Sequence, residues 1–538
     1  MARHLALICA IGIACGSSPP THPTADQEAK AQALLAGPDW YRNAVFYEVD
    51  VRSFMDSNGD GIGDLAGLTS KLDYLKDLGI DAIWLMPVYP TAFKDSGYDI
   101  SDYRNIDSDY GDLAAFDALL AAAHQRGMRV IMDLVLNHTS DQHAWFQDSQ
   151  SSKTSAHADW YIWSDTPSDP NIGCSTYSPQ FGDTAWTLSP TRNQYFFHRF
   201  YPQQPDLNYR NPAVVAETLD TVKFWLQRGI DGFRCDVIGL LFESASGCLM
   251  IPETVAYIQQ LRQVMNGFPN TVMVAETDIG IGPVPYLGNG SDMFHMAFDF
   301  PYGYFWGVAM LGENASIAKA ALTTVTTQYP PGAQDAMLIG SHDVGRAWSK
   351  AQQIAWRMQR ATEIAMLSHA TPYIYYGDEL ALHDGTTFVV DSRDSARTPF
   401  PWDTSPEHGF TTSSTPWIPF SDGADQTNVV SEDQDGSSML TFHRQLLAFR
   451  RGHAVWGTGD MTVLDSDNTA LLAFTRTNDE EAYLVVESFS GDPQEGNMPA
   501  SITKIGAVVW GSGDASLDAG NVHVKIPEGG SAVFAITP

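Results

Sequence analysis

Residues 232–237 read GFRCDV, a short apolar run that ends with an arginine and an aspartate two positions apart. Alternate residues of a strand face the same side, so Arg234 and Asp236 point in one direction. Seven similar runs, separated by helical patterns such as residues 112–125, 214–227, 258–266 and 351–367, cover residues 44–49, 82–86, 130–136, 272–276, 296–298, 337–339 and 373–376. Eight strands that alternate with helices predict an α/β fold with a parallel sheet. A closed (β/α)8 TIM barrel is our first choice. An open, doubly wound sheet is the alternative, although no glycine-rich phosphate loop opens any of these helices.

This alternation is interrupted once and later ends, which divides the chain into domains. We assign residues 37–137 and 208–452 to the barrel. Between them, residues 138–207 lose the helical period and are rich in aromatic residues, Ser, Pro and Gly, which predicts an irregular insertion domain after the third strand, over the barrel mouth. Residues 453–538 carry short alternating apolar runs, which predict a C-terminal antiparallel β-sandwich.

The N-terminus has the features of an export signal. Arg3 and His4 precede an apolar run over residues 5–14, which is shorter than the roughly 20 residues of a spanning helix. The following segment resembles a bacterial lipoprotein cleavage site with Cys15 as the lipidated residue; an ordinary secretory peptide cut nearby is the alternative. We expect a lipoprotein-like signal peptide over residues 1–15 and a flexible tether over residues 16–36. The protein would then be periplasmic or at the cell surface, in contact with a membrane only through the lipid on Cys15.

Composition limits the partners. The 31 Lys and Arg residues stand against 64 Asp and Glu residues, a formal charge of −33. Nucleic acids and anionic membranes attract basic patches, so this chain is not expected to bind either, and a neutral ligand fits best. Hydrophobic residues make up 44% and charged residues 18%, which excludes disorder for the bulk of the chain.

Charged side chains gather where the predicted strands end. Residues at the carboxyl ends of barrel strands face the active site. Three carboxylates (Asp236, Glu276 and Asp343) arrive there from different strands, and two histidines and Arg234 accompany them. The arginine favours ionised Asp236. The apolar residues before Glu276 favour a raised pKa, as a general acid requires. A structural ion pair would explain any one of these acids, but not the whole set.

These strand ends resemble the four signature regions of glycoside hydrolase family 13, the α-amylase superfamily. The regions are residues 133–138 (DLVLNH), 232–236 (GFRCD), 275–276 (AE) and 342–343 (HD). Residues 204–208 (QPDLN) further resemble the oligo-1,6-glucosidase and α-glucosidase branch. So do residues 56–64, 97–103 and 392–399, with Trp402.

The resemblance implies a role for each residue of the site. Asp236 would be the nucleophile, Glu276 the acid/base, and Asp343 would hold the sugar hydroxyls. The implied contacts of the first sugar subsite are Arg234, His138 and His342, with Tyr98 as stacking floor and with Asp99 and Arg393 at the far end of the terminal glucose. Among the aromatic residues of the insertion, Phe181 is the first candidate to face the sugar.

The resulting hypothesis is a retaining hydrolase of short, neutral α-gluco-oligosaccharides that works through a glycosyl-enzyme intermediate. Leu240 stands where starch-degrading members have a basic residue or histidine, which favours small substrates. Val237 resembles members that accept α-1,6 linkages. The alternatives are a trehalose synthase-like transglycosylase or isomerase, an α-amylase acting on malto-oligosaccharides or starch, and a non-catalytic glycan-binding protein.

A second motif predicts a structural cation. Oxygen ligands recur at alternate positions of the loop at residues 56–64, with glycines that permit a tight turn. The predicted ligands are Asp56, Asn58, Asp60, the Ile62 carbonyl and Asp64. We expect Ca²⁺, with Mg²⁺ as the second choice and a plain polar turn as the alternative.

The cysteines outside the signal peptide have separate expected fates. Cys235 alternates with the inward-facing Arg234 and Asp236, so it should be buried against a helix. Cys174 in the insertion and Cys248 after the fourth strand would both overhang the barrel mouth. We predict that these two form a disulfide.

Overall fold

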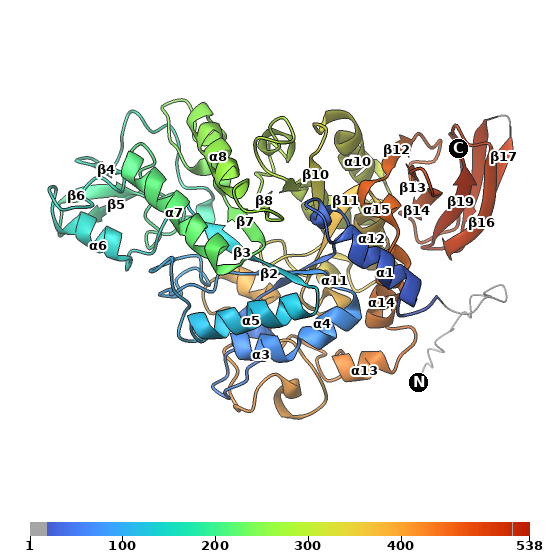
Figure 1. Cartoon of the computed structure of the whole chain (residues 1–538), viewed down its shortest axis with the longest axis horizontal. Coiled ribbons are helices and arrows are strands. Elements are labelled where there is room, and N and C mark those ends of the chain that lie inside the picture. Colours follow the sequence, from blue (N-terminus) through green and yellow to red (C-terminus); the bar gives the residue numbers. More distant parts are fainter. Residues whose placement is uncertain (1–18, 519) are drawn as a thin grey trace, which may run out of the picture.

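The computed structural model describes residues 19–518 and 520–538, and its centre is a closed barrel of eight parallel strands (Figure 1). The strand order around the barrel is β1-β11-β10-β9-β8-β7-β3-β2. The strands are β1 (Phe46–Val49), β2 (Ala82–Leu85), β3 (Arg129–Val135), β7 (Gly232–Asp236), β8 (Val272–Ala275), β9 (Met296–Phe298), β10 (Gln334–Leu338) and β11 (Ala370–Tyr375). All eight predicted strands are present, and the TIM barrel is confirmed.

Helices surround the barrel and connect most of its strands. They are α2 (Val51–Phe54), α3 (Leu65–Ser70), α4 (Leu72–Leu78), α5 (Leu113–Gln125), α7 (Pro212–Arg228), α8 (Pro252–Met265), α9 (Phe300–Leu311), α10 (Ser316–Gln328), α11 (Ala347–Lys350), α12 (Ala355–Leu367), α13 (Val429–Asp433), α14 (Met439–Arg450) and α15 (Ala454–Thr458). The connection from β8 to β9 contains only the 3-10 turn η4 (Val284–Tyr286). None of the described helices is long and apolar enough to cross a bilayer.

The longest of these helices, α7, shows how local sequence sets its ends. Asn211 caps its first turn by accepting the backbone N–H of Ala213, and Pro212 occupies the first helical position, where its missing N–H costs nothing. Gly229 ends the helix in the left-handed conformation. Helix α7 then delivers the chain directly into strand β7, which carries the predicted nucleophile.

Strand β7 is held close to β8 by a glycine. A Cβ atom at Gly232 would lie 2.0 Å from the carbonyl oxygen of Val272, so no other residue fits there without displacing the backbone. The two strands pair with Cys235 opposite Ala275. Asp236 and Glu276 therefore leave the barrel side by side, at the same height.

The insertion is a small domain built from α6 (Ala144–Ser151) and a three-stranded antiparallel sheet. The sheet has the order β4-β6-β5, from β4 (Trp163–Ser164), β5 (Trp186–Ser189) and β6 (Gln194–Phe197). A disulfide joins Cys174 of the insertion to Cys248 in the loop after β7, which confirms the predicted pairing. Cys235 is buried and free, also as predicted.

The C-terminal domain lies at the opposite end of the molecule from the insertion (Figure 1). It has a five-stranded sheet (β12-β13-β14-β19-β16) and a three-stranded sheet (β15-β18-β17), both antiparallel. The strands are β12 (Asp460–Leu464), β13 (Leu471–Thr477), β14 (Ala482–Ser488), β15 (Gln494–Pro499), β16 (Lys504–Gly511), β17 (Asp514–Asp518), β18 (Asn521–Ile526) and β19 (Ser531–Thr537). The alternating apolar pattern over residues 522–537 corresponds to two strands, β18 and β19, joined by a turn.

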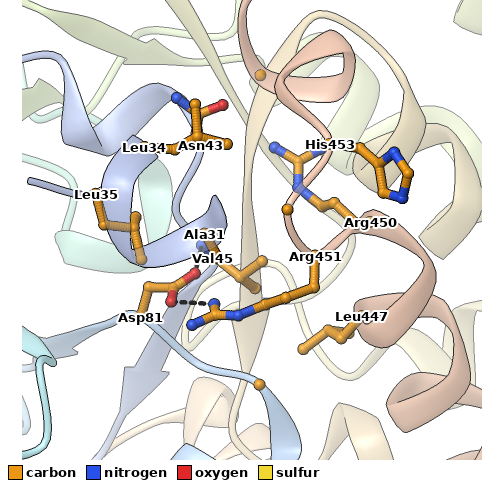
Figure 2. Close-up of a pocket in the computed structure, with 13 residues that line it drawn as sticks. Ala31, Leu34, Leu35, Asn43, Val45, Asp81, Leu447, Arg450, Arg451 and His453 are labelled. Atoms are coloured by element: carbon orange, nitrogen blue, oxygen red, sulfur yellow. Dashed lines mark hydrogen bonds and ion pairs between the residues drawn. The ribbon is translucent and has the colours of Figure 1, made fainter. Parts of the chain in front are cut away.

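The predicted tether requires a correction. The signal peptide and Cys15 lie outside the described residues, but residues 25–34 of the expected tether form helix α1 (Ala25–Leu34). Thr24 and Gln27 make a reciprocal capping box at its start. Arg451 ties the helix to the barrel by pairing with Glu28 at 2.8 Å and with the buried Asp81. Figure 2 shows Arg451 paired with Asp81 in a pocket that Ala31, Leu34 and Leu35 also line.

Candidate active site

A cavity of about 450 Å³ opens where the barrel strands end. Most of the predicted site residues line it: Tyr98, His138, Phe181, Asp236, Glu276, Asp343 and Arg393. Arg234 and His342 are buried directly beneath it, in contact with these acids. Side chains far apart in the sequence thus converge on one cavity that can hold a small polar ligand.

Arg234 organises the acids of the cavity floor. One guanidinium nitrogen, Nη1, donates to Asp133 at 2.8 Å and to Asp236 at 2.6 Å. The other, Nη2, lies 3.0 Å from Oε2 of Glu276. The carboxylates of Asp236 and Glu276 are therefore held on neighbouring nitrogens of a single buried fork. Such charge-assisted contacts fix geometry as well as charge.

Burial separates the titration of these two acids. It raises the pKa of Glu276 to about 8; Arg234 opposes the rise, while the charges of Asp236 and Asp343 add to it. Burial also raises the pKa of Asp236, but only to about 6; Arg234 opposes this rise through its charge and through a hydrogen bond. The arginine acts in the direction we predicted for Asp236, although burial outweighs it. At neutral pH, Glu276 is mostly protonated and Asp236 mostly ionised.

Glu276 is further held by the backbone after the nucleophile. The N–H of Val237 donates to Oε2 of Glu276 at 2.7 Å. To do so, Val237 adopts the left-handed conformation, with φ 36° and ψ 34°. This costs a β-branched residue roughly 1–3 kcal/mol, and such strain is concentrated at functional sites. The strained backbone at Val237 thus helps to orient the carboxyl group of Glu276.

Asp343 is kept ionised by three cations. Although burial alone would raise its pKa, His342 at 3.0 Å, Arg393 at 3.2 Å and Arg397 at 3.4 Å hold that pKa well below the ordinary value. In return, Asp343 and Glu48 raise the pKa of His342 to about 9 in spite of its burial. Asp343 is thus a permanent negative charge and is unsuited to proton transfer.

Tyr98 and His138 form the floor and one wall. The Tyr98 ring stacks on His342, with ring centroids 5.4 Å apart and an interplanar angle of 14°. Burial lowers the pKa of His138 to about 4, so it is neutral and can both donate and accept hydrogen bonds. Its Nε2 lies 3.1 Å from the amide nitrogen of Gln204, which gives the QPDLN segment a place beside the cavity.

Asp99 does not reach the cavity, contrary to the prediction. Its carboxylate accepts hydrogen bonds from the Thr91 hydroxyl and from the backbone N–H groups of residues 92, 94 and 95, so it braces its own loop. Asp95, three residues before Tyr98, lines the cavity instead and pairs with Arg393. The carboxylate oxygens of Asp99 are thus occupied by hydrogen bonds within the loop, and Asp95 is the acid of this loop that lines the cavity.

Further aromatic residues line the cavity, and Phe200, Phe300 and Tyr304 among them were missed in the sequence. Tyr177 and Phe200 come from the insertion, and Phe300 and Tyr304 come from the start of α9. The dense aromatic run at residues 300–306 (FPYGYFW), directly after a barrel strand, was a usable signal for the last two. Tyr177 also donates to Asp278 at 3.2 Å, which ties the insertion to the loop after β8.

The predicted cation loop is an ordered turn. Asp56 accepts the N–H groups of residues 58, 59 and 61, and Asp60 accepts that of Ile62. Asp64 caps α3 by accepting the N–H of Gly67. Within the described residues, no group of three or more His, Cys, Asp or Glu side chains is arranged to hold a metal. The calcium site stays a prediction.

Taken as chemistry, the cavity presents an ionised carboxylate, a protonated carboxyl group and a fixed third charge at the mouth of a TIM barrel. Enzymes that cleave glycosidic bonds typically use two carboxyl groups with separated pKa values, one ionised and one protonated. The fold and site therefore define a carbohydrate-active enzyme.

Comparison with known proteins specifies the family. The model of the alpha amylase catalytic domain matches residues 49–459. The chain belongs to the α-amylase family, glycoside hydrolase family 13, and is a glycoside hydrolase enzyme.

Relatives within this family carry different activities. The chain is 35% identical over 522 residues to "Trehalose synthase/amylase TreS" of Mycobacterium tuberculosis, covering 88% of this chain and 86% of that protein. It is 32% identical over 517 residues to the oligo-1,6-glucosidase of Parageobacillus thermoglucosidasius, covering 84% and 90%. A crystal structure of trehalulose synthase from Pseudomonas mesoacidophila MX-45 superimposes with a TM-score of 0.82 at 29% identity, covering 93% and 99%.

Proposed function

We propose that the protein is a retaining α-glucosidase that removes single glucose units from short α-gluco-oligosaccharides. The observation that carries the proposal is the pair of carboxyl groups, Asp236 and Glu276, on one guanidinium with pKa values of about 6 and 8. One group is ready to attack and the other to donate a proton at the same pH.

In the first step, ionised Asp236 attacks the anomeric carbon while Glu276 gives its proton to the departing glycosidic oxygen. The covalent ester that forms removes the charge of Asp236. The pKa of Glu276 then falls, because that charge is one of the causes of its elevation. Deprotonated Glu276 is now a base for the water that releases the sugar. The environment of the pair therefore supports both half-reactions.

Two further groups support a preference for chain ends. Arg393 pairs with Asp95 and also contacts Asp343, and we take this ion-pair network in the cavity lining as the closed end of the sugar site. A closed end admits one terminal sugar and excludes a polymer that runs through. Asp343, held ionised, would accept hydrogen bonds from sugar hydroxyl groups and stabilise positive charge at the reacting carbon.

A hydrolysis time course on maltose, isomaltose, sucrose, trehalose and soluble starch, with the product anomer followed by NMR, tests the proposal. We expect glucose released first as the α-anomer from the short substrates. Release of the β-anomer would exclude the retaining mechanism, and starch as the best substrate would exclude the preference for short chains.

An isomerising or transglycosylating activity is a second candidate, and the trehalose synthase relatives favour it. The same glycosyl-enzyme would form, but a sugar hydroxyl group would replace water in the second step. Incubation with concentrated maltose separates the two: accumulation of trehalose supports the synthase, and accumulation of glucose alone supports the hydrolase.

We further propose export with lipid attachment at Cys15, and a structural Ca²⁺ in the loop at residues 56–64. The disulfide between Cys174 and Cys248 supports export, because such bonds persist in oxidising compartments. Detergent phase partition of the wild type and of Cys15→Ser, expressed in bacteria, tests the anchor. If both proteins partition into the aqueous phase, the anchor is excluded.

A further inference from the structure

Helix α9 carries an exposed apolar stripe that begins at the cavity. Tyr304 lines the cavity and is 37% exposed, and Phe305, Val308 and Leu311 follow it with 44%, 60% and 45% exposure. At 100° per residue, these four positions lie within one arc of the helix surface. The stripe faces solvent, whereas the opposite side of α9 packs in the core.

The loop after β8 extends the same surface. Ile279 lines the cavity, and Ile281 is 40% exposed. A Cβ atom at Gly282 would lie 3.9 Å from the ring of Pro301, so this loop adjoins the first turn of α9. We call Ile279, Ile281, Tyr304, Phe305, Val308 and Leu311 the apolar rim. Exposed patches of this kind mark binding surfaces when they are contiguous.

We propose that the apolar rim binds the aglycone of the substrate, and that alkyl α-glucosides are substrates of this enzyme. This inference rests on the proposed function, since it assigns the leaving-group side of the same cavity. The rim starts at residues that line the cavity, and α9 leads away from it by roughly 10 Å between residues 304 and 311, at 1.5 Å per residue. An extended hexyl or octyl chain has a similar length.

The chemistry of the rim favours an alkyl chain over further sugars. Phe305, Val308 and Leu311 have no side-chain hydrogen-bonding groups. A glucan laid along them would lose water from its hydroxyl groups without gaining partners, which is costly. An alkyl chain instead gains about fourfold in affinity for each methylene group that it buries.

The test compares hexyl with methyl α-glucoside, whose alcohol leaving groups have similar intrinsic reactivity. We expect the wild type to show at least a tenfold higher kcat/KM for the hexyl compound. The variant Phe305→Gln/Val308→Gln/Leu311→Gln should lose about tenfold of this ratio, while the methyl compound reports on the catalytic centre. A control is Leu188→Gln/Val430→Gln, which replaces two apolar residues, each 45% exposed, that do not line the cavity. It should keep the wild-type ratio.

Binding measured without turnover separates the two proposals. S-linked hexyl and methyl α-glucosides resist hydrolysis, and their affinities by titration calorimetry should show the same ratio and the same loss in the triple variant. If the protein turns over no glucoside but the ratio of hexyl to methyl affinities is as expected, the hydrolase is refuted and the apolar rim is still supported as a binding surface. A wild-type ratio near one, or an equal ratio in the triple variant, refutes the rim. A dimer by sedimentation that the triple variant dissociates, with the ratio unchanged, would assign the rim to a second copy of the chain.

Discussion

The pH dependence of kcat/KM provides the sharpest test of the acid pair. In the proposed mechanism, activity needs Asp236 ionised and Glu276 protonated, so it should fall below a pKa of about 6 and above a pKa of about 8. The optimum then lies near pH 7, and each further unit beyond either limb should cost about tenfold. We would measure kcat/KM for p-nitrophenyl α-glucoside between pH 4 and pH 10.

The variant Glu276→Gln assigns the basic limb. Its amide cannot deprotonate, and the nitrophenolate leaving group needs little acid assistance, so the basic limb should disappear while the acidic limb near pH 6 persists. The control Asp278→Asn changes an acid at the mouth that contacts Tyr177 and should preserve both limbs. If the basic limb survives in Glu276→Gln, it belongs to another group. His342, with a pKa of about 9, would be the first suspect, and the assignment of the acid would be wrong.

Three further predictions concern stability. Replacing Cys174 and Cys248 by Ser opens a loop of 74 residues and should lower the free energy of unfolding by about 2–4 kcal/mol, measured by denaturant titration under oxidising conditions; an unchanged midpoint would contradict it. Arg451→Ala should lower the free energy of unfolding by about 3–5 kcal/mol, because it leaves the carboxylate of Asp81 buried without its charge partner. A melting temperature within 1 °C of the wild type would refute this account of how α1 docks. Removal of Ca²⁺ with a chelator should lower the melting temperature, restored by Ca²⁺, and leave KM unchanged; an identical melt with and without chelator would exclude the cation at residues 56–64.

The barrel could be predicted because its signals are local and repeated. Each strand is an apolar run, each helix has its own period and caps, and the order of the elements allows few topologies. The acids at 236, 276 and 343 could be placed for the same reason, since strand ends share one face of a parallel barrel. The C-terminal domain was harder. Strand β16 (Lys504–Gly511) contains Gly506 and irregular pairing with β19, which hide the alternation that marks a strand.

The roles of Asp95 and Asp99 could not be separated in the sequence, because both acids stand within three residues of Tyr98. What separates them is backbone geometry. Phe93 and Ser96 adopt left-handed conformations, with φ of 55° and 50°, and fold the loop back on itself. Four hydrogen bonds then converge on the Asp99 carboxylate. Residue type and spacing therefore do not reveal which of the two acids will hydrogen-bond to its own loop and which will line the cavity.

The three acids of the cavity differ in pKa because they differ in neighbours, since Asp and Glu have similar pKa values in water. Asp343 touches three cations, Asp236 shares one arginine with Asp133, and Glu276 meets that arginine at its second nitrogen and faces the other two acids. The resulting order of pKa values runs from Asp343 through Asp236 to Glu276. The positions of the neighbouring cations, and not the positions of the carboxyl groups alone, therefore determine which acid is ionised and which is protonated at neutral pH. Arg234→Lys tests this directly: a lysine has no second nitrogen to hold Glu276, so the charge stays but the fork is lost. We expect a fall in kcat of at least tenfold with the acidic limb shifted, and wild-type kinetics in this variant would show that charge alone, without the shared fork, sets the site.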